Sequence, residues 1–413
     1  QNVLAIQLFN DTIGSSDILI DAVLETPEPF SEPAPPSPGR ANNSSTSSPP
    51  PNIRQVEHSP AEPGSSDPVT ISAKVTDPDG VASVTLLYQI VAPGDFIPAF
   101  LPNPYSTLTS NADAPLQPNP EFEDPSNWTT LPMTSTGDGD LFTATLPIQN
   151  HRTLVRYRIL AEDSIGSSIR VPYPKDPSLN FAYFVYNGVP DYVAGNTTHS
   201  ATTLTTLPVY QMITRDEDRA YAYAYESTGD NFRIPKGNPA RKTYNWECAL
   251  VYDGVVYDHV GWRLRQNNDR YTGNGKRSMR FRMNRGHYFQ ARGEDGEKLP
   301  VKWRRFNTSK MARFGGINSY GFHETMNSKL WRMVGVECPY FLPAHWRIID
   351  GADEAPDQYE GDFFGMTTVV QDIDGRLLDE RDLPNGNIYK LKDGVTNPLE
   401  LQRNQTREAV SDG

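Results

Sequence analysis

Residues 256–282, VYDHVGWRLRQNNDRYTGNGKRSMRFR, decide how the C-terminal half of this chain is expected to fold. Two strand-like runs flank a polar turn whose glycines, Gly273 and Gly275, tolerate a positive φ. Side chains two positions apart in a strand share a face, so Arg263 and Arg265 are expected to point the same way, with Lys276 opening the return strand. Three such cations suit a phosphate. A solvated, charged edge strand explains the same residues without any ligand.

Bulk properties narrow the class of protein. A chain of 413 residues suits two or three domains, and a net charge of −13 argues against a general nucleic-acid binder. Only Cys248 and Cys338 are present, so the protein is not a disulfide scaffold; they are either two unpaired thiols or a pair in an oxidising compartment. No apolar run is long enough to span a bilayer. The composition leaves the oligomeric state open.

The chain opens inside a strand pattern, which predicts a piece of a longer, processed protein. Residues 1–24 contain two alternating runs, VLAIQLF and ILIDAVL, which we expect to be the last strands of an upstream β module. They resemble the end of a jelly-roll module of secreted bacterial proteins. Residues 25–66 are rich in Pro and Ser and poor in aliphatic residues, which predicts a linker.

Residues 67–187 return to a period of two, with short runs separated by Gly, Asp and Pro turns, which predicts a β-sandwich. The runs VTISAKVTDPDG, FTATLP and VRYRILAEDSIG resemble immunoglobulin-like and fibronectin type III-like modules of bacterial surface proteins. Residues 91–140 are expected to form a long loop excursion at one end of the sandwich.

Two ligand sites are conceivable in this sandwich. Carboxylates at turns predict oxygen ligands for Ca²⁺, although Asp and Gly also form turns without any metal; the residues are Asp77, Asp79, Asp138 and Asp140. Trp128 and Tyr105 would suit a carbohydrate, and simple packing explains them equally well.

Residues 188–206 form a polar join, and residues 207–413 change to an α+β pattern. Phe322, Met326 and Leu330 lie four apart and predict a helix over about 321–334, ending before Gly335. Strands are expected at 246–251, 256–265, 277–284, 344–349 and 363–370.

Several runs in this region resemble, in the same order, the motifs of the CotH kinase family of atypical kinases. They are VGWRLRQNN, GKRSMRFR, SKLWRMVGVECP, VVQDIDGRLL and LPNGNIYKLKDG. The resemblance covers roughly residues 207–394. It implies a distantly protein-kinase-like fold that binds ATP with Mg²⁺ and transfers a phosphoryl group to a protein hydroxyl. It also implies a secreted or cell-surface protein with a protein substrate or a surface partner.

The resemblance assigns roles to particular residues. Lys276 matches the family's phosphate-contacting lysine, and Arg263 and Arg265 match its arginine pair. Glu324 lies on the helix where a partner for that lysine is expected, and Asp374, with Asp372, lies near the connection between lobes, where ribose or metal would bind. An exposed helix glutamate and a tight turn account for these carboxylates without a ligand.

Two residues depart from the family pattern. Gln266 replaces a glycine, and Gln371 replaces a glutamate, which removes a charge. The family's catalytic aspartates are expected downstream of Gly413, so the domain looks truncated, and no catalytic residue is assigned in this chain. The alternative is a non-catalytic surface, adhesion or matrix protein that carries a pseudokinase module.

Overall fold

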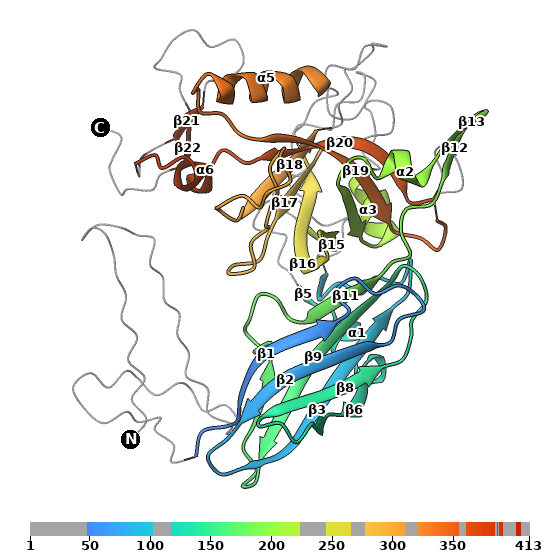
Figure 1. The fold of residues 1–413 in the computed structure, drawn as a ribbon, viewed down its shortest axis with the longest axis vertical. Helices are drawn as coiled ribbons and strands as arrows, with labels where there is room; N and C mark the ends of the chain where they lie inside the picture. Colours follow the sequence, from blue (N-terminus) through green and yellow to red (C-terminus); the bar gives the residue numbers. More distant parts are fainter. Residues whose placement is uncertain are drawn as a thin grey trace.

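The computed structural model describes residues 48–101, 117–223, 245–265, 277–309, 321–354, 361–384, 386, 388–390 and 402–405. The protein is mostly β, with little helix. The all-β organisation predicted for the N-terminal part is present, whereas the described residues of the part predicted to be α+β form a closed barrel accompanied by few helices. Its described strands form a sandwich in the N-terminal part and a closed barrel in the C-terminal part (Figure 1). The two terminal strands predicted over residues 1–24 lie outside the described residues.

Two antiparallel sheets make up the sandwich. One contains β1 (Asn52–Ser59), β2 (Val69–Thr76), β8 (Leu141–Leu146) and β7 (Thr134–Ser135). The other contains β10 (Ser168–Val171), β9 (Thr153–Asp163), β3 (Val81–Val91) and β6 (Thr129–Pro132), with β11 (Phe181–Val185) also paired to β9. Alternate residues of β2 are buried in the core, as the period of two predicts.

Two predicted boundaries are wrong. The linker was expected to reach residue 66, but residues 52–59 form β1, which pairs with β2 because Ile53 and Val56 reach the core. The expected loop over residues 91–140 contains β6 and β7, which belong to the two sheets. It also contains short elements: β4 (Phe100–Leu101), β5 (Gln117–Pro118), α1 (Pro120–Glu123) and the 3-10 helix η3 (Pro125–Asn127).

The join between the two parts contains β12 (Tyr192–Ala194), β13 (Thr197–His199) and α2 (Ala201–Leu204). The barrel follows, with the strand order β14 (Val209–Ile213), β15 (Trp246–Tyr252), β16 (Val255–Leu264), β17 (Met279–Arg282), β18 (Arg305–Ser309), β20 (Phe363–Gln371) and β19 (Phe341–Ile349). β14 and β19 run parallel and close the ring, whereas the other neighbours are antiparallel. Every strand that the sequence predicted in this region is present.

Large aromatic side chains fill the barrel. They include Trp246, Trp262, Phe281, Phe306 and Trp346, all essentially inaccessible to solvent. Aromatic burial on this scale stabilises the ring of strands, because each such side chain removes about 150–250 Å² from water. The barrel is therefore a packed core and provides a rigid support for side chains on its outer surface.

Among the described residues of the C-terminal part, helices α3 (Asp216–Tyr223), α5 (Gly321–Met333) and α6 (Gly375–Glu380) accompany the strands, together with the α2 already mentioned. A hairpin of β21 (Ile388–Lys390) and β22 (Gln402–Gln405) follows. α5 confirms the predicted helix and lies beside β19 and β20. Its apolar stripe, however, faces away from the barrel: Phe322 is 57% exposed and Leu330 52%. None of the described helices is long and apolar enough to cross a membrane.

Buried ion pairs join the sandwich to the barrel. Arg156 of β9 donates two hydrogen bonds to Asp258 of β16, at 2.8 and 3.1 Å, and both side chains are fully buried. Arg152, directly before β9, donates to the carbonyl oxygens of Gly351 and Ala352 and pairs with Asp362. Paired buried charges are tolerated only in a fixed geometry, so the two parts act as one unit.

Candidate anion-binding face of the barrel

Arginines gather on the outer surface of β16, β17 and β18. Trp262, Leu264, Phe281 and Phe306 point into the barrel core. Because side chains alternate along a strand, the residues between them point outward. We call this set the arginine face; it consists of Arg263, Arg280, Arg282 and Arg305, all partly or fully exposed.

The strand register places these arginines next to one another. Arg263 lies directly opposite Arg280 on the neighbouring strand, and Arg282 lies directly opposite Arg305. Opposed residues on one face of an antiparallel pair have Cβ atoms about 4.5–5.5 Å apart, and like charges there are destabilising. The face therefore concentrates positive charge on a chain whose net charge is −13.

Two carboxylates border the arginine face, and Arg305 interacts with both of them. Asp372 accepts from Arg280 at 2.9 Å and lies 3.1 Å from the Nε of Arg305, while Asp374 lies 3.4 Å from Arg305. Asn307 also donates to Asp372, at 3.3 Å. Within the described residues, neither Arg263 nor Arg282 forms an ion pair. Cations exceed carboxylates at this surface, which is the arrangement that an anion would complete.

The pKa shifts have the same origin. Burial lowers the pKa of Arg263, the charges of Arg280, Arg305 and Arg282 lower it further, and Asp372 opposes them. The pKa of Arg282 is lowered by burial and by its arginine neighbours. Arginine side chains stay protonated in proteins, so these neighbouring arginines remain charged and repel one another.

Not all the predicted site residues reach the arginine face. Arg263 is part of it. Arg265 directly follows β16, and its backbone N–H donates to the carbonyl oxygen of Ser278 at 2.8 Å. It therefore extends the pairing between the two strands of the hairpin. Lys276 lies outside the described residues. Glu324 accepts a hydrogen bond of 3.4 Å from Ser309, at the far end of β18 from Arg305.

Asp374 has a structural task as well as a place beside the face. Its carboxylate accepts from the N–H of Arg376 at 3.0 Å and caps the first turn of α6. Burial raises its pKa, the N–H of Arg376 opposes this, and the nearby charge of Asp372 adds to the rise. Asp374 therefore has the local structural role that was predicted as the alternative to ligand binding, and it also lies beside the arginine face.

Arg280, Arg282 and Arg305 are site residues that the sequence pattern did not predict. Arg280 and Arg282 repeat the spacing of Arg263 and Arg265 in the returning strand, which was a usable signal. Arg305 had none, because β18 was not predicted, and its place beside β17 depends on barrel closure.

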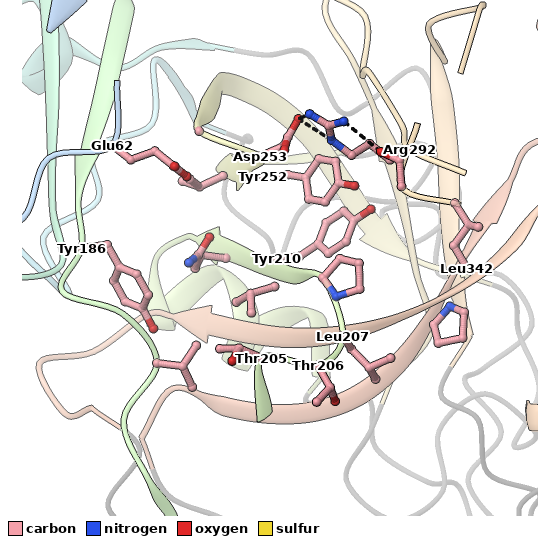
Figure 2. A pocket seen from close by; sticks show the side chains of 18 of the residues that line it. Glu62, Tyr186, Thr205, Thr206, Leu207, Tyr210, Tyr252, Asp253, Arg292 and Leu342 are labelled. Carbon is pink, nitrogen blue, oxygen red and sulfur yellow. Dashed lines mark hydrogen bonds and ion pairs between the residues drawn. The ribbon is translucent and has the colours of Figure 1, made fainter. Parts of the chain in front are cut away.

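A cavity of about 870 Å³ lies elsewhere, between the sandwich, the join and the barrel. Figure 2 shows Tyr210 and Tyr252 stacked on each other on one side and the Asp253–Arg292 ion pair above them. Glu62 and Tyr186 of the sandwich part close another side. The cavity shares no lining residue with the arginine face, and its arginine is already neutralised by Asp253.

Other sequence-based candidates have structural roles. Trp128, considered for carbohydrate, donates from its indole N–H to the carbonyl of Phe122 and lies 4.0 Å below the guanidinium of Arg158, which indicates packing. Tyr105 lies outside the described residues. Cys248 and Cys338 are free thiols. Asp140 pairs with Arg54, and neither Asp140 nor Asp138 is among the carboxylates that cluster with Asp77 and Asp79.

Comparison with known proteins adds little. No family model matches the chain, and no curated protein matches it. Among solved structures, one match is the chitinase ChiW from Paenibacillus sp., described as a cell-surface-expressed multi-modular enzyme, with 9% identity and a TM-score of 0.20. The match covers 37% of this chain and only 10% of that one, and a likeness of this size carries no functional argument.

Proposed function

We propose that the barrel binds a phosphate-bearing ligand, ATP with Mg²⁺, on the arginine face. The single observation that carries the proposal is the juxtaposition of Arg263 and Arg280, with Asp372 as the nearest shared counter-charge. Guanidinium groups grip phosphate oxygens in pairs and are not lost by deprotonation. A bound triphosphate would replace repulsion between arginines with charge-assisted hydrogen bonds.

The resemblance to the CotH kinase family supports ATP as the phosphate donor. In this proposal the barrel is the first part of a distantly kinase-like domain, in a modular protein that is secreted or displayed at a cell surface with an immunoglobulin- or fibronectin III-like sandwich. Arg263, Arg265 and Lys276 would contact phosphates, and Glu324 and Asp374 would orient the lysine and the metal. The protein substrate is defined only by its hydroxyl group.

Residues of the site favour binding over turnover. Gln371, which replaces the family's glutamate, accepts from the N–H of Tyr340 at 3.2 Å and donates to Glu380. Both ends of its amide are therefore used within the protein, and it offers no charge to a metal. This observation favours the second candidate function, a non-catalytic surface or matrix protein whose pseudokinase module binds nucleotide.

Thermal unfolding with and without Mg-ATP tests the proposal. A ligand at 100 times its dissociation constant stabilises the native state by about 2.7 kcal/mol, which is a shift of several degrees for a protein of this size. We expect that shift in the wild-type chain and not in Arg280→Gln or Lys276→Ala. Arg292→Gln serves as the control, because this arginine lines the separate cavity and is paired with Asp253. No shift in the wild-type chain would remove the proposal.

A further inference from the structure

A second charged cluster lies in the sandwich, far from the arginine face. Asp77 and Asp79 belong to the DPDG turn between β2 and β3, and Asp163 is the last residue of β9. The register pairs Asp163 with Val81, directly after that turn. One carboxylate oxygen from each of the three residues lies within 4.8 Å of the other two.

The geometry points to a calcium site formed by Asp77, Asp79 and Asp163. Ca²⁺ binds carboxylate oxygens at about 2.3–2.6 Å, so two oxygens on opposite sides of one ion are about 4.6–5.2 Å apart. The cluster fits within that span. Mg²⁺ demands near-ideal octahedral geometry, whereas Ca²⁺ accepts flexible arrangements of carboxylate and carbonyl oxygens. The class of ligand is therefore a divalent cation bound through oxygen atoms, and we take calcium as the ion.

Buried, unpartnered oxygens support this assignment independently of the cluster. Asp163 is only 1% exposed; its Oδ1 accepts from the N–H groups of Ile165 and Ser167 at 3.0 and 2.8 Å. Its Oδ2 is buried and has no hydrogen-bond donor, and the same holds for Oδ2 of Asp77. A buried carboxylate oxygen without a donor is costly, and a coordinated cation removes that cost.

The three carboxylates of the cluster have no basic side chain beside them among the described residues. Among the described side chains, no Lys, Arg or His lies within ion-pair distance of Asp77, Asp79 or Asp163. Three carboxylate groups thus converge on one point without a basic side chain beside them.

The location suggests what the ion does. β9 begins at the barrel, where Arg152 contacts Ala352, and ends at Asp163, so the cluster lies at the opposite end of the sandwich (Figure 1). Ser48, which precedes β1, donates to Asp79 at 2.7 Å. Calcium would fix the β2–β3 turn, the end of β9 and the chain entering β1 in one arrangement. It would stiffen the sandwich at the end that lies away from the barrel.

Calcium titration of the whole chelator-treated chain, by calorimetry and by thermal unfolding, tests the site. We expect a dissociation constant on the order of 10⁻⁴ to 10⁻³ M, as in extracellular modules, and a rise of the unfolding temperature that Mg²⁺ does not reproduce. Asp163→Asn keeps the oxygen that accepts from Ser167, and it should weaken calcium binding at least tenfold, as should Asp77→Asn. Glu162→Gln, on the opposite face of β9, should bind like the wild type.

Asp79 is exposed, so Asp79→Asn decides the question if a buried variant does not fold. Absence of calcium binding in the wild-type chain overturns the site. Equal binding by the wild type and the folded Asp variants also overturns it, because calcium would then bind elsewhere.

Discussion

Arg263 and Arg280 lie directly opposite each other on β16 and β17, on the outer face of the barrel. Arg280 is paired with Asp372, whereas Arg263 depends on the more distant charge of the same carboxylate. Like charges that face each other across two strands are destabilising, so the pair costs stability as long as no anion lies between them.

The first prediction follows from that repulsion. Arg263→Gln should stabilise the ligand-free protein by roughly 0.2–1 kcal/mol at low salt, the size of one cross-strand pair, and the gain should shrink as salt screens the charges. Urea unfolding at two salt concentrations measures it. Arg292→Gln loses a pair with Asp253 instead and should gain nothing. A clear loss of stability in Arg263→Gln would show that the arginine serves the fold.

The second prediction concerns the joint between sandwich and barrel. Arg156→Ala leaves Asp258 buried without its bidentate partner, and such a change costs about 3–5 kcal/mol. We expect a corresponding drop in the urea midpoint and faster proteolysis between the two parts. Arg170→Ala should have a much smaller effect, because this arginine is 26% exposed and lies 4.0 Å from the more exposed Glu123. Similar losses in both variants would contradict a special role for the buried pair.

A third prediction is a pH dependence from His259. Burial alone would lower its pKa, but Asp258 and Glu247 outweigh burial and raise it above the usual 6.5. A group whose pKa is raised in the folded state contributes its full stabilisation of that state at pH values below its unfolded-state pKa. This contribution is lost as the pH rises through the folded-state pKa. The free energy of unfolding should thus decrease from about pH 6.5 upward through the raised folded-state pKa. His259→Gln should flatten this part of the profile, and an unchanged slope would contradict the assignment.

The fourth prediction restores the residue expected from the family. Gln371→Glu places a second carboxylate beside Glu380, whose pKa burial already raises. Leaving like charges buried without partners should destabilise the protein by about 1–3 kcal/mol at pH 7. The loss should diminish as pH falls and one carboxylate takes up a proton. A variant as stable as the wild type at pH 7 would show that the position can hold a charge.

Sequence periodicity was sufficient for the local elements. The alternation in β2 and β9 predicted the sandwich, and the spacing of Phe322, Met326 and Leu330 predicted α5. It failed for β14 and β18, which are short and whose burial comes from neighbours on both sides of a closed ring. Periodicity also did not predict which face of α5 is buried: Thr325 and Ser328 are buried, while the apolar stripe is exposed.

The candidate sites were predictable only in part, because they depend on strand register. Arg263 could be proposed from its own strand, but Arg305 enters the face through pairing of β17 with β18. Asp77 and Asp79 were visible as a turn, whereas Asp163 is separated from them by more than 80 positions and meets them through the pairing of β3 with β9. Contacts between distant segments cannot be read from a local pattern.

The most direct test of the central claim is calorimetric titration of ATP, with and without Mg²⁺, into the wild-type chain, Arg263→Gln and Arg292→Gln. Our account predicts saturable binding by the wild type that weakens with salt, at least tenfold weaker binding by Arg263→Gln, and unchanged binding by Arg292→Gln. Absence of binding by the wild type, or equal binding by Arg263→Gln and the wild type, would contradict the assignment of the arginine face as a phosphate site.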